Sequence, residues 1–316
     1  MTASDTPTRA VADLGAVEFA ARLGGEGLGV RLGPFDAKLR SDVAEIVAPL
    51  YRLYRDYTLL DGDDRVFNLH LGLVTVRKWP RLANAKVRLI VDGRAPHDDL
   101  PVGQALAVLE WGLNLVIALR AHSWLMLHSA AVERDNGVLL LPAWPGSGKT
   151  TLCTALVHRG WRLFSDEFGL IRPSSGEAFP IPRPMPLKNE SIDVIRAFAP
   201  DAELGPTIPN TRKGTIAHVK PPTASIRAAH RSAPVRWIVF PQWSAGADLV
   251  FDEMAKIDAF MMLATNAFNY EMLGESAFTT VRGLVGDAQC FRLVYSALDR
   301  AIELLNDLAA RDGERS

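Results

Sequence analysis

The chain has 316 residues, enough for one large domain or two of medium size. Hydrophobic residues make up 48% and charged residues 22%, which is the balance of an ordinary globular protein. A net charge of −1 provides no basic field, so we expect no nucleic-acid partner. Two cysteines are too few for a disulfide framework, and residues 1–9 lack the apolar core of a signal peptide. These features predict a cytoplasmic protein without a membrane partner.

The first third of the chain is predicted to form a disordered tail over residues 1–12 and a small α+β domain over residues 13–98. Apolar residues recur at helical spacing over residues 41–55. Short apolar runs on either side of Gly72, and one before an Asp-Gly turn signal, favour strands. These strands are expected at residues 66–71, 73–76 and 87–91.

Residues 99–316 are predicted to form the larger domain, which begins with a helix over residues 101–121. The most apolar run, 111–127, is interrupted by Asn114, Arg120 and His122. It is too short and too polar to span a bilayer, so we interpret it as a buried helix followed by a strand. Frequent prolines between residues 167 and 234 favour loops and edge strands. The other elements expected are strands at 124–128, 138–141, 161–164 and 236–240, and helices at 149–158, 256–274 and 298–310.

Residues 138–151 read Val-Leu-Leu-Leu-Pro-Ala-Trp-Pro-Gly-Ser-Gly-Lys-Thr-Thr, which predicts an apolar strand, a tight glycine loop and a helix beginning at Lys149. Such a loop binds phosphates because backbone N–H groups converge on it and a helix N-terminus points into it. Ala143 stands where the motif has its first glycine, and a modest backbone adjustment would accommodate its Cβ. We predict ATP as the ligand, with Trp144 packing at the rim or stacking on the adenine. The expected nucleotide-binding residues are Ala143, Trp144, Pro145, Gly146, Ser147, Gly148, Lys149, Thr150 and Thr151.

Asp166 and Glu167 follow the apolar strand predicted at 161–164. Their position predicts two carboxylates at the carboxyl end of a strand near the loop, where open α/β sheets bind ligands. One would hold Mg²⁺, and the other would accept the proton of a substrate hydroxyl. The alternative interpretation is an exposed acidic turn.

Three segments resemble the catalytic core of the bacterial HPr kinase/phosphorylase family. They are residues 128–132 (His-Ser-Ala-Ala-Val), the glycine loop, and residues 158–167 (His-Arg-Gly-Trp-Arg-Leu-Phe-Ser-Asp-Glu). The family carries a His-Gly-x-x-Val strand, a loop ending in Gly-Lys-Ser/Thr and an Arg-Gly-His-x-Leu-x-x-Asp-Asp segment. The chain is most similar to the branch called HPr kinase-related kinase A, and related kinases phosphorylate lasso peptides. The firm similarity covers residues 128–172.

The resemblance implies an α/β fold with a P-loop kinase core of the HPr kinase/phosphoenolpyruvate carboxykinase type, in which a mixed sheet is flanked by helices. It implies ATP and Mg²⁺ as cofactors, with Lys149 on the nucleotide and Thr150 on the metal. Asp166 matches the catalytic base and a candidate metal ligand, and Glu167 replaces the family's second aspartate at the metal. His128 matches the histidine beside the catalytic carboxylate, although without the resemblance it reads as a core residue.

The family's Glu-x-Arg-Gly stretch and its Pro-Val-x-Pro-Gly-Arg-Asn loop are not present, which leaves reverse phosphorolysis open. Lys188, Arg212 and Lys213 are candidates to supply positive charge at the transferred phosphoryl group, or are ordinary solvated cations.

The predicted function is Mg²⁺-dependent transfer of phosphate from ATP to a hydroxyl, above all a serine, of a small protein or peptide such as an HPr-like protein or a peptide precursor. The alternatives are a small-molecule kinase or carboxykinase-type enzyme on the same scaffold, and a nucleotide-gated binding module without turnover. Because the family usually forms oligomers, a homo-oligomer is also expected.

Overall fold

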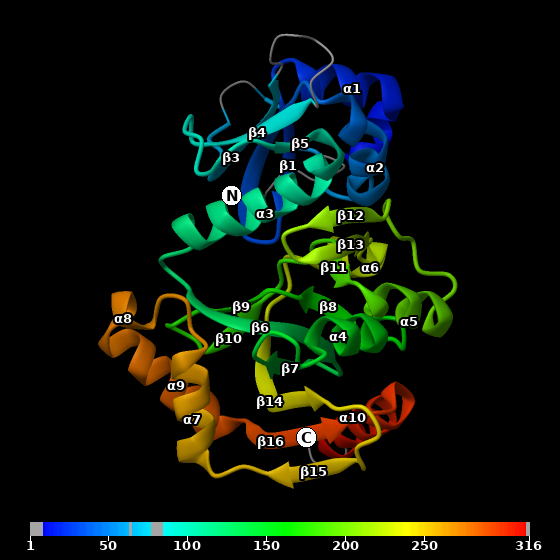
Figure 1. Cartoon of the computed structure of the whole chain (residues 1–316). Coiled ribbons are helices and arrows are strands. Elements are labelled where there is room, and N and C mark those ends of the chain that lie inside the picture. Colours follow the sequence, from blue (N-terminus) through cyan, green and yellow to red (C-terminus); the bar gives the residue numbers. More distant parts are fainter. Residues whose placement is uncertain (1–8, 63–64, 77–84, 314–316) are drawn as a thin grey trace.

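The computed structural model describes residues 9–62, 65–76 and 85–313. It is a mixed α/β structure with three sheets, stacked from the N-terminal unit at the top of Figure 1 to the C-terminal helices at the bottom. The mixed α/β class predicted from the sequence is therefore confirmed.

The N-terminal unit is a five-stranded sheet in the order β1-β2-β3-β4-β5, antiparallel except for the parallel pair β2–β3. Helices pack against it around a core of leucine, valine and aromatic side chains. Its strands are β1 (Leu28–Leu32), β2 (Phe35–Ser41), β3 (Leu69–Val76), β4 (Lys86–Val91) and β5 (Leu100–Pro101). Its helices are a 3₁₀ turn (Val11–Leu14), α1 (Gly15–Gly24), α2 (Ala44–Tyr54), a second 3₁₀ turn (Val102–Gln104) and α3 (Ala105–Arg120).

Residues 9–12 do not form a disordered tail. Val11 is buried, and its amide donates a hydrogen bond of 2.9 Å to the carbonyl of Tyr57. The predicted tail is thus wrong for residues 9–12, and residues 1–8 lie outside the described residues.

Helix α3 packs on β3 and β4, although the sequence placed it with the larger domain. Among the described residues, the segment Val102–Arg120 is the one helix long and apolar enough, by length and composition, to cross a membrane. However, 61% of its most apolar window is buried inside the protein, as in a core helix.

The large sheet runs in the order β10-β9-β6-β7-β14-β16-β15, and β8 also pairs with β6. Strands β7, β14 and β16 are parallel, while β6 and β15 are antiparallel to their neighbours. The strands are β6 (Leu125–Arg134), β7 (Gly137–Pro142), β8 (Arg162–Ser165), β9 (Phe168–Ile171), β10 (Glu177–Phe179), β14 (Ala233–Trp243), β15 (Val250–Glu253) and β16 (Gln289–Tyr295).

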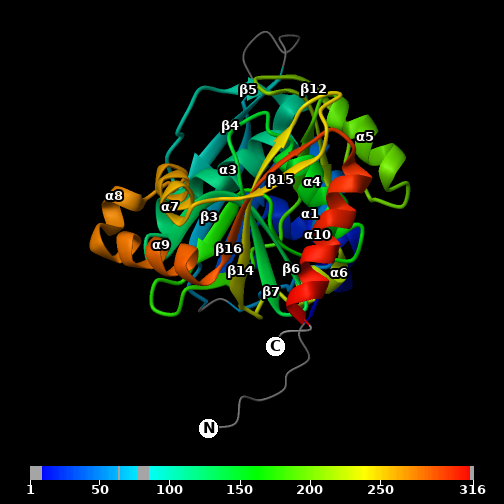
Figure 2. The ribbon, with the colours of Figure 1, turned by 90° about the horizontal axis from the view of Figure 1, so that it is seen from below.

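Helices cover both faces of this sheet (Figure 2). Because side chains alternate along a strand, Leu139 and Leu141 of β7 pack toward α4 and α10, whereas Val138 and Leu140 pack toward α7 and α9. The helices are α4 (Lys149–Val157), α7 (Lys256–Thr265), α8 (Tyr270–Leu273), α9 (Glu275–Asp287) and α10 (Leu298–Gly313).

The proline-rich segment forms more regular structure than the sequence predicted. It contains an antiparallel sheet in the order β11-β13-β12, and the helix α5, where the sequence favoured loops and edge strands. Prolines occupy an edge strand and turns, which leaves the intervening residues free to form a helix. The elements are β11 (Met185–Lys188), α5 (Glu190–Phe198), β12 (Ile208–Thr211), β13 (Gly214–Val219) and α6 (Thr223–Arg227).

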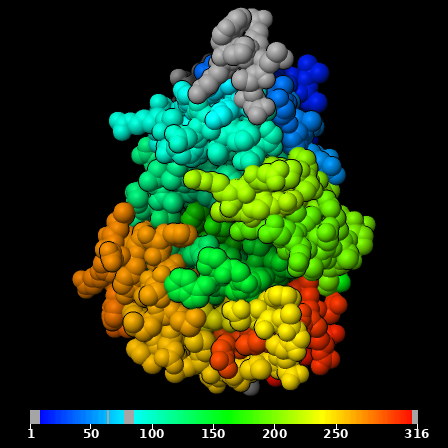
Figure 3. Space-filling model, in the orientation of Figure 1, coloured from blue at the N-terminus to red at the C-terminus, as the bar shows by residue number. Residues whose placement is uncertain are grey.

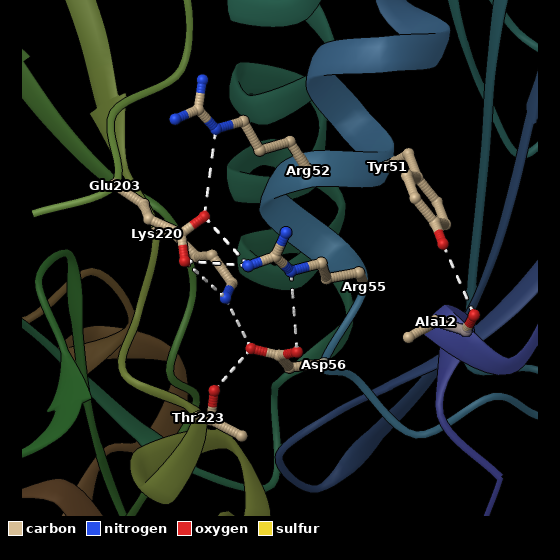
Figure 4. Close-up of polar contacts among 8 residues, drawn as sticks. All are labelled: Ala12, Tyr51, Arg52, Arg55, Asp56, Glu203, Lys220 and Thr223. Carbon is tan, nitrogen blue, oxygen red and sulfur yellow. Dashed lines mark hydrogen bonds and ion pairs between the residues drawn. The ribbon is translucent and has the colours of Figure 1, made fainter. Parts of the chain in front are cut away.

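An ion-pair cluster joins the N-terminal unit to this small sheet (Figure 4). The ammonium of Lys220, 7% exposed, lies 2.6 Å from Asp56 and 3.3 Å from Glu203. Arg55 also contacts Glu203 at 2.9 Å, and the hydroxyl of Thr223 donates to Asp56 at 2.5 Å. These contacts fix the end of α2 against the segment that carries β12 and β13.

Candidate functional site

The glycine loop connects β7, which ends at Pro142, to α4, which begins at Lys149. Gly146 and Gly148 have φ values of +89° and +83°, a conformation that side chains other than glycine rarely adopt. Ala143 does not have a positive φ, and its side chain is buried. The first position of the loop therefore does not require glycine here, which explains why alanine is compatible with it.

The ends of two neighbouring strands hold the loop from below. The amide of Trp243, at the end of β14, donates a hydrogen bond of 2.9 Å to the carbonyl of Ser147. The hydroxyl of Tyr295, at the end of β16, donates a hydrogen bond of 3.4 Å to the carbonyl of Gly148. The first amides of α4 have no partners within their own helix, as at any helix N-terminus. Sequence reasoning missed Trp243 and Tyr295, because no local motif marks a strand end as a loop support.

The loop forms one wall of a pocket of about 460 Å³. Figure 3 shows this face hollowed between the green surface of the loop and the yellow-green surface of β12 and β13. Trp144 is 58% exposed at the rim, as expected from its position. The lining residues are His128, Trp144, Pro145, Gly146, Ser147, Gly148, Lys149, Thr150, Thr151, Glu167, Pro186, Lys188, Ser191 and Lys213.

Lys149, His128 and Glu167 meet inside this pocket. The Nζ of Lys149 lies 3.4 Å from His128 Nε2, and His128 Nδ1 lies 3.8 Å from a carboxylate oxygen of Glu167. Burial, reinforced by the charge of Lys149, lowers the pKa of His128 to about 4, so the ring is neutral at neutral pH. Burial opposes the charge of Glu167, but the nearby positive charges, that of Lys149 foremost, outweigh it and lower the pKa of Glu167. The pocket thus presents the Lys149 amine and the Glu167 carboxylate beside a neutral imidazole.

Asp166 follows β8 as predicted, but its carboxylate does not line the phosphate pocket. It lies in a small cavity behind Glu167, of about 20 Å³, and the side chain is 5% exposed. Neither carboxylate oxygen has a hydrogen-bond partner among the described residues. Burial raises the pKa of Asp166 to about 7, while the charge of Lys149 opposes the shift.

Polar groups that no sequence motif predicted surround Asp166 in this cavity. Asn114 Oδ1, Arg183 Nε and both ring nitrogens of His218 are buried and have no hydrogen-bond partner within the described ranges. Burial lowers the pKa of His218, which keeps its ring neutral. Glu110 lies in the same wall, where it pairs with Arg183 at 3.2 Å. A cavity of this size has room for about one water molecule, whose hydrogen bonds would serve these groups.

The three predicted loop cations separate into two groups. Lys188 and Lys213 line the phosphate pocket, from β11 and from the turn between β12 and β13. Arg212 is exposed and lines a neighbouring groove instead. Burial, followed by the charge of Lys188, lowers the pKa of Lys213. Two of the three cations therefore line the pocket beside the loop, whereas Arg212 lines only the neighbouring groove.

The pocket offers a few oxygen ligands for a magnesium ion. The hydroxyl of Thr150 and the carboxylate of Glu167 both line it, and Mg²⁺ is commonly held by one or two such groups together with phosphate oxygens and water. The described residues contain no group of three or more His, Cys, Asp or Glu that could hold a metal by themselves. The residues thus fit a metal that arrives with a nucleotide. Asp166 does not line this pocket, and its role as a further metal ligand stays a prediction.

Comparison with known proteins found no family model and no curated protein that matches the chain.

Proposed function

We propose that this chain is a Mg²⁺-dependent ATP phosphotransferase of the HPr kinase-like type that phosphorylates a serine hydroxyl of a small protein or peptide. The observation that carries the proposal is the convergence of Lys149, His128 and Glu167 at a glycine loop that opens into a pocket. A loop with this backbone geometry, followed by a helix N-terminus, suits a polyphosphate.

The pocket residues fall into two groups, those that would contact the phosphates and those that would hold Mg²⁺. Lys149 would contact the β- and γ-phosphates, and Lys188 and Lys213 would contact the oxygens on which charge develops during transfer. Thr150 and Glu167 would hold Mg²⁺, which supplies charge neutralisation at the phosphates when bound.

The proposed reaction is an in-line displacement. The acceptor oxygen forms a bond to the γ-phosphorus, the bond from that phosphorus to the bridging oxygen breaks, and ADP leaves. Asp166 takes the proton of the acceptor hydroxyl, since a carboxylate with a pKa of about 7 is matched to proton transfer near neutral pH. Glu167, which lines both the pocket and the cavity of Asp166, would orient the hydroxyl. Hydrogen bonds of this kind tighten when substrate binds.

Hydrolysis of [γ-³²P]ATP in magnesium buffer tests the site without knowledge of the acceptor, because water then replaces the hydroxyl. Lys149→Ala and Asp166→Asn should each lower the rate by at least ~10²-fold, the typical loss on removing one preorganised group. Arg282→Ala, at an exposed position on α9, is the control. Full activity in both site variants would refute the assignment. ATP binding without hydrolysis or transfer would instead indicate a nucleotide-gated binding module.

A further inference from the structure

An open groove lies next to the loop pocket, and the proposed nucleotide site leaves most of it unused. Its volume is about 310 Å³, and it runs between α3, the end of the N-terminal sheet and the turn that joins β12 to β13. Its lining residues are Leu89, His97, Leu100, Trp111, Asn114, Leu115, Glu167, Arg212 and Lys213.

The groove is continuous with the phosphate pocket through two shared side chains. Glu167 and Lys213 line both, so a molecule in the groove reaches the side of Glu167 where the γ-phosphate of a bound nucleotide would end. Asn114 connects the groove to the cavity of Asp166, because it lines both. A hydroxyl presented from the groove therefore lies beside Glu167 and next to the wall of the cavity that holds Asp166.

The charge of the groove is positive at one end. Arg212 is exposed and has no hydrogen-bond or ion-pair partner among the residues that the structure describes. Lys213 lies beside it, with its ammonium 5.9 Å from the centre of the Trp111 ring. Glu167 is the one carboxylate in the lining, and it faces the phosphate pocket as well. An unpaired guanidinium in this position is suited to a carboxylate of a bound molecule.

The rest of the groove is apolar, with one polar exception. Leu89, Leu100 and Leu115 surround Trp111, so the lining suits an aliphatic side chain. The Oδ1 of Asn114 is buried and belongs with the polar groups around Asp166, so it is not an exposed acceptor in the groove. An apolar wall beside an unpaired cation suits an extended peptide better than a compact metabolite.

We propose that this groove binds the phosphate acceptor as a peptide segment of another protein, with an aliphatic residue and an acidic residue flanking the serine. The acidic residue pairs with Arg212, and the aliphatic one packs against Trp111 and the leucines. This inference rests on the proposed function and adds to it the chemistry of the acceptor. Since the N-terminal unit supplies one wall, it also gives that unit a part in substrate selection.

The test uses short synthetic peptides with a central serine, a leucine on one side and Asp, Gln or Lys on the other, in both orders. The full chain is assayed for transfer from [γ-³²P]ATP, beside ATP hydrolysis without peptide. The Asp series should have the highest kcat/KM, by about fivefold over Gln, which is the size of an exposed ion pair. Arg212→Glu should reverse the order so that Lys peptides are preferred. Arg282→Glu, an equal charge change on α9, should keep the wild-type order.

Each outcome decides the question. Equal rates for the three series, or an order unchanged by Arg212→Glu, would overturn the proposal. So would a chain that hydrolyses ATP through Lys149 but phosphorylates none of the peptides. Absence of ATP binding would refute the proposed function itself, which separates the two failures. Melting temperatures of both glutamate variants verify that they are folded, as expected for exposed positions.

Discussion

We predict that replacing the buried carboxylate of Asp166 with an amide stabilises the folded chain although it removes the proposed catalytic base. Its pKa is raised from 3.8 to about 7, chiefly by burial, so the folded chain binds the proton more tightly than the unfolded chain does. Stability is therefore lost as the pH rises from about 4 to about 7. The side-chain amide of the Asp166→Asn variant cannot ionise, so the free energy of unfolding of the variant does not fall for this reason as the pH rises.

The magnitude follows from the shift. One pKa unit corresponds to about 1.4 kcal/mol, so the full shift is about 4 kcal/mol, and roughly 3 kcal/mol of it falls between about pH 5 and about pH 8. The variant should gain that much in the free energy of unfolding relative to wild type over this range, while its activity falls. Such a combination is expected where a catalytic group is held in an unfavourable environment.

Urea unfolding of both proteins at several pH values measures the difference. Asp201→Asn, which removes a carboxylate at an exposed position, is the matched control. A difference between Asp166→Asn and wild type that is independent of pH would contradict the reasoning, because it would mean that Asp166 is ionised in the folded chain throughout the range.

Three further predictions concern the loop and its neighbours. Gly148→Ala should abolish nucleotide binding, because its φ is +83° and the added Cβ would lie 2.8 Å from atoms of Trp243 and Tyr295. Gly146→Ala has a similar φ but open space around the Cβ, so it should lose only about 1–3 kcal/mol of stability from backbone strain. Calorimetry measures ATP binding and urea unfolding measures stability for both variants. In His128→Gln, the fall of kcat/KM on the acidic side of its pH profile should keep its midpoint near pH 7, because the pKa of Asp166 is about 7 and that of His128 about 4. A midpoint that moves, or a fall that vanishes, would assign this titration to His128 instead. Trp144→Ala should weaken ATP binding by about fivefold if the exposed ring stacks on the base, and an unchanged Kd would leave it a rim residue.

The geometry of the glycine loop was predictable because it is local. Two glycines with positive φ, a preceding buried strand and a following helix are all encoded within residues 138–151. Helices α2, α3 and α10 were likewise predicted from apolar spacing. Helix α9 has buried residues at helical spacing, including Ala277, Val281 and Leu284, but two glycines weaken the pattern and it was missed.

The environment of Asp166 could not be predicted from the sequence. Its position after β8 was correct, but its burial depends on Asn114 of α3, Arg183 before β11 and His218 of β13. These residues come together only because the N-terminal unit packs over the small sheet. Arg212 and Lys213 both line the groove, and only the packing of other elements around the β12–β13 turn makes Lys213 line the loop pocket as well.

The proposed function requires that the glycine loop bind a triphosphate. Calorimetric titration of ATP into the purified chain in magnesium buffer measures this binding directly. We predict saturable binding of one ATP per chain, strongly weakened in Lys149→Ala and unchanged in Arg282→Ala. Titrations in which neither ATP nor GTP binds to the folded wild-type chain would contradict it.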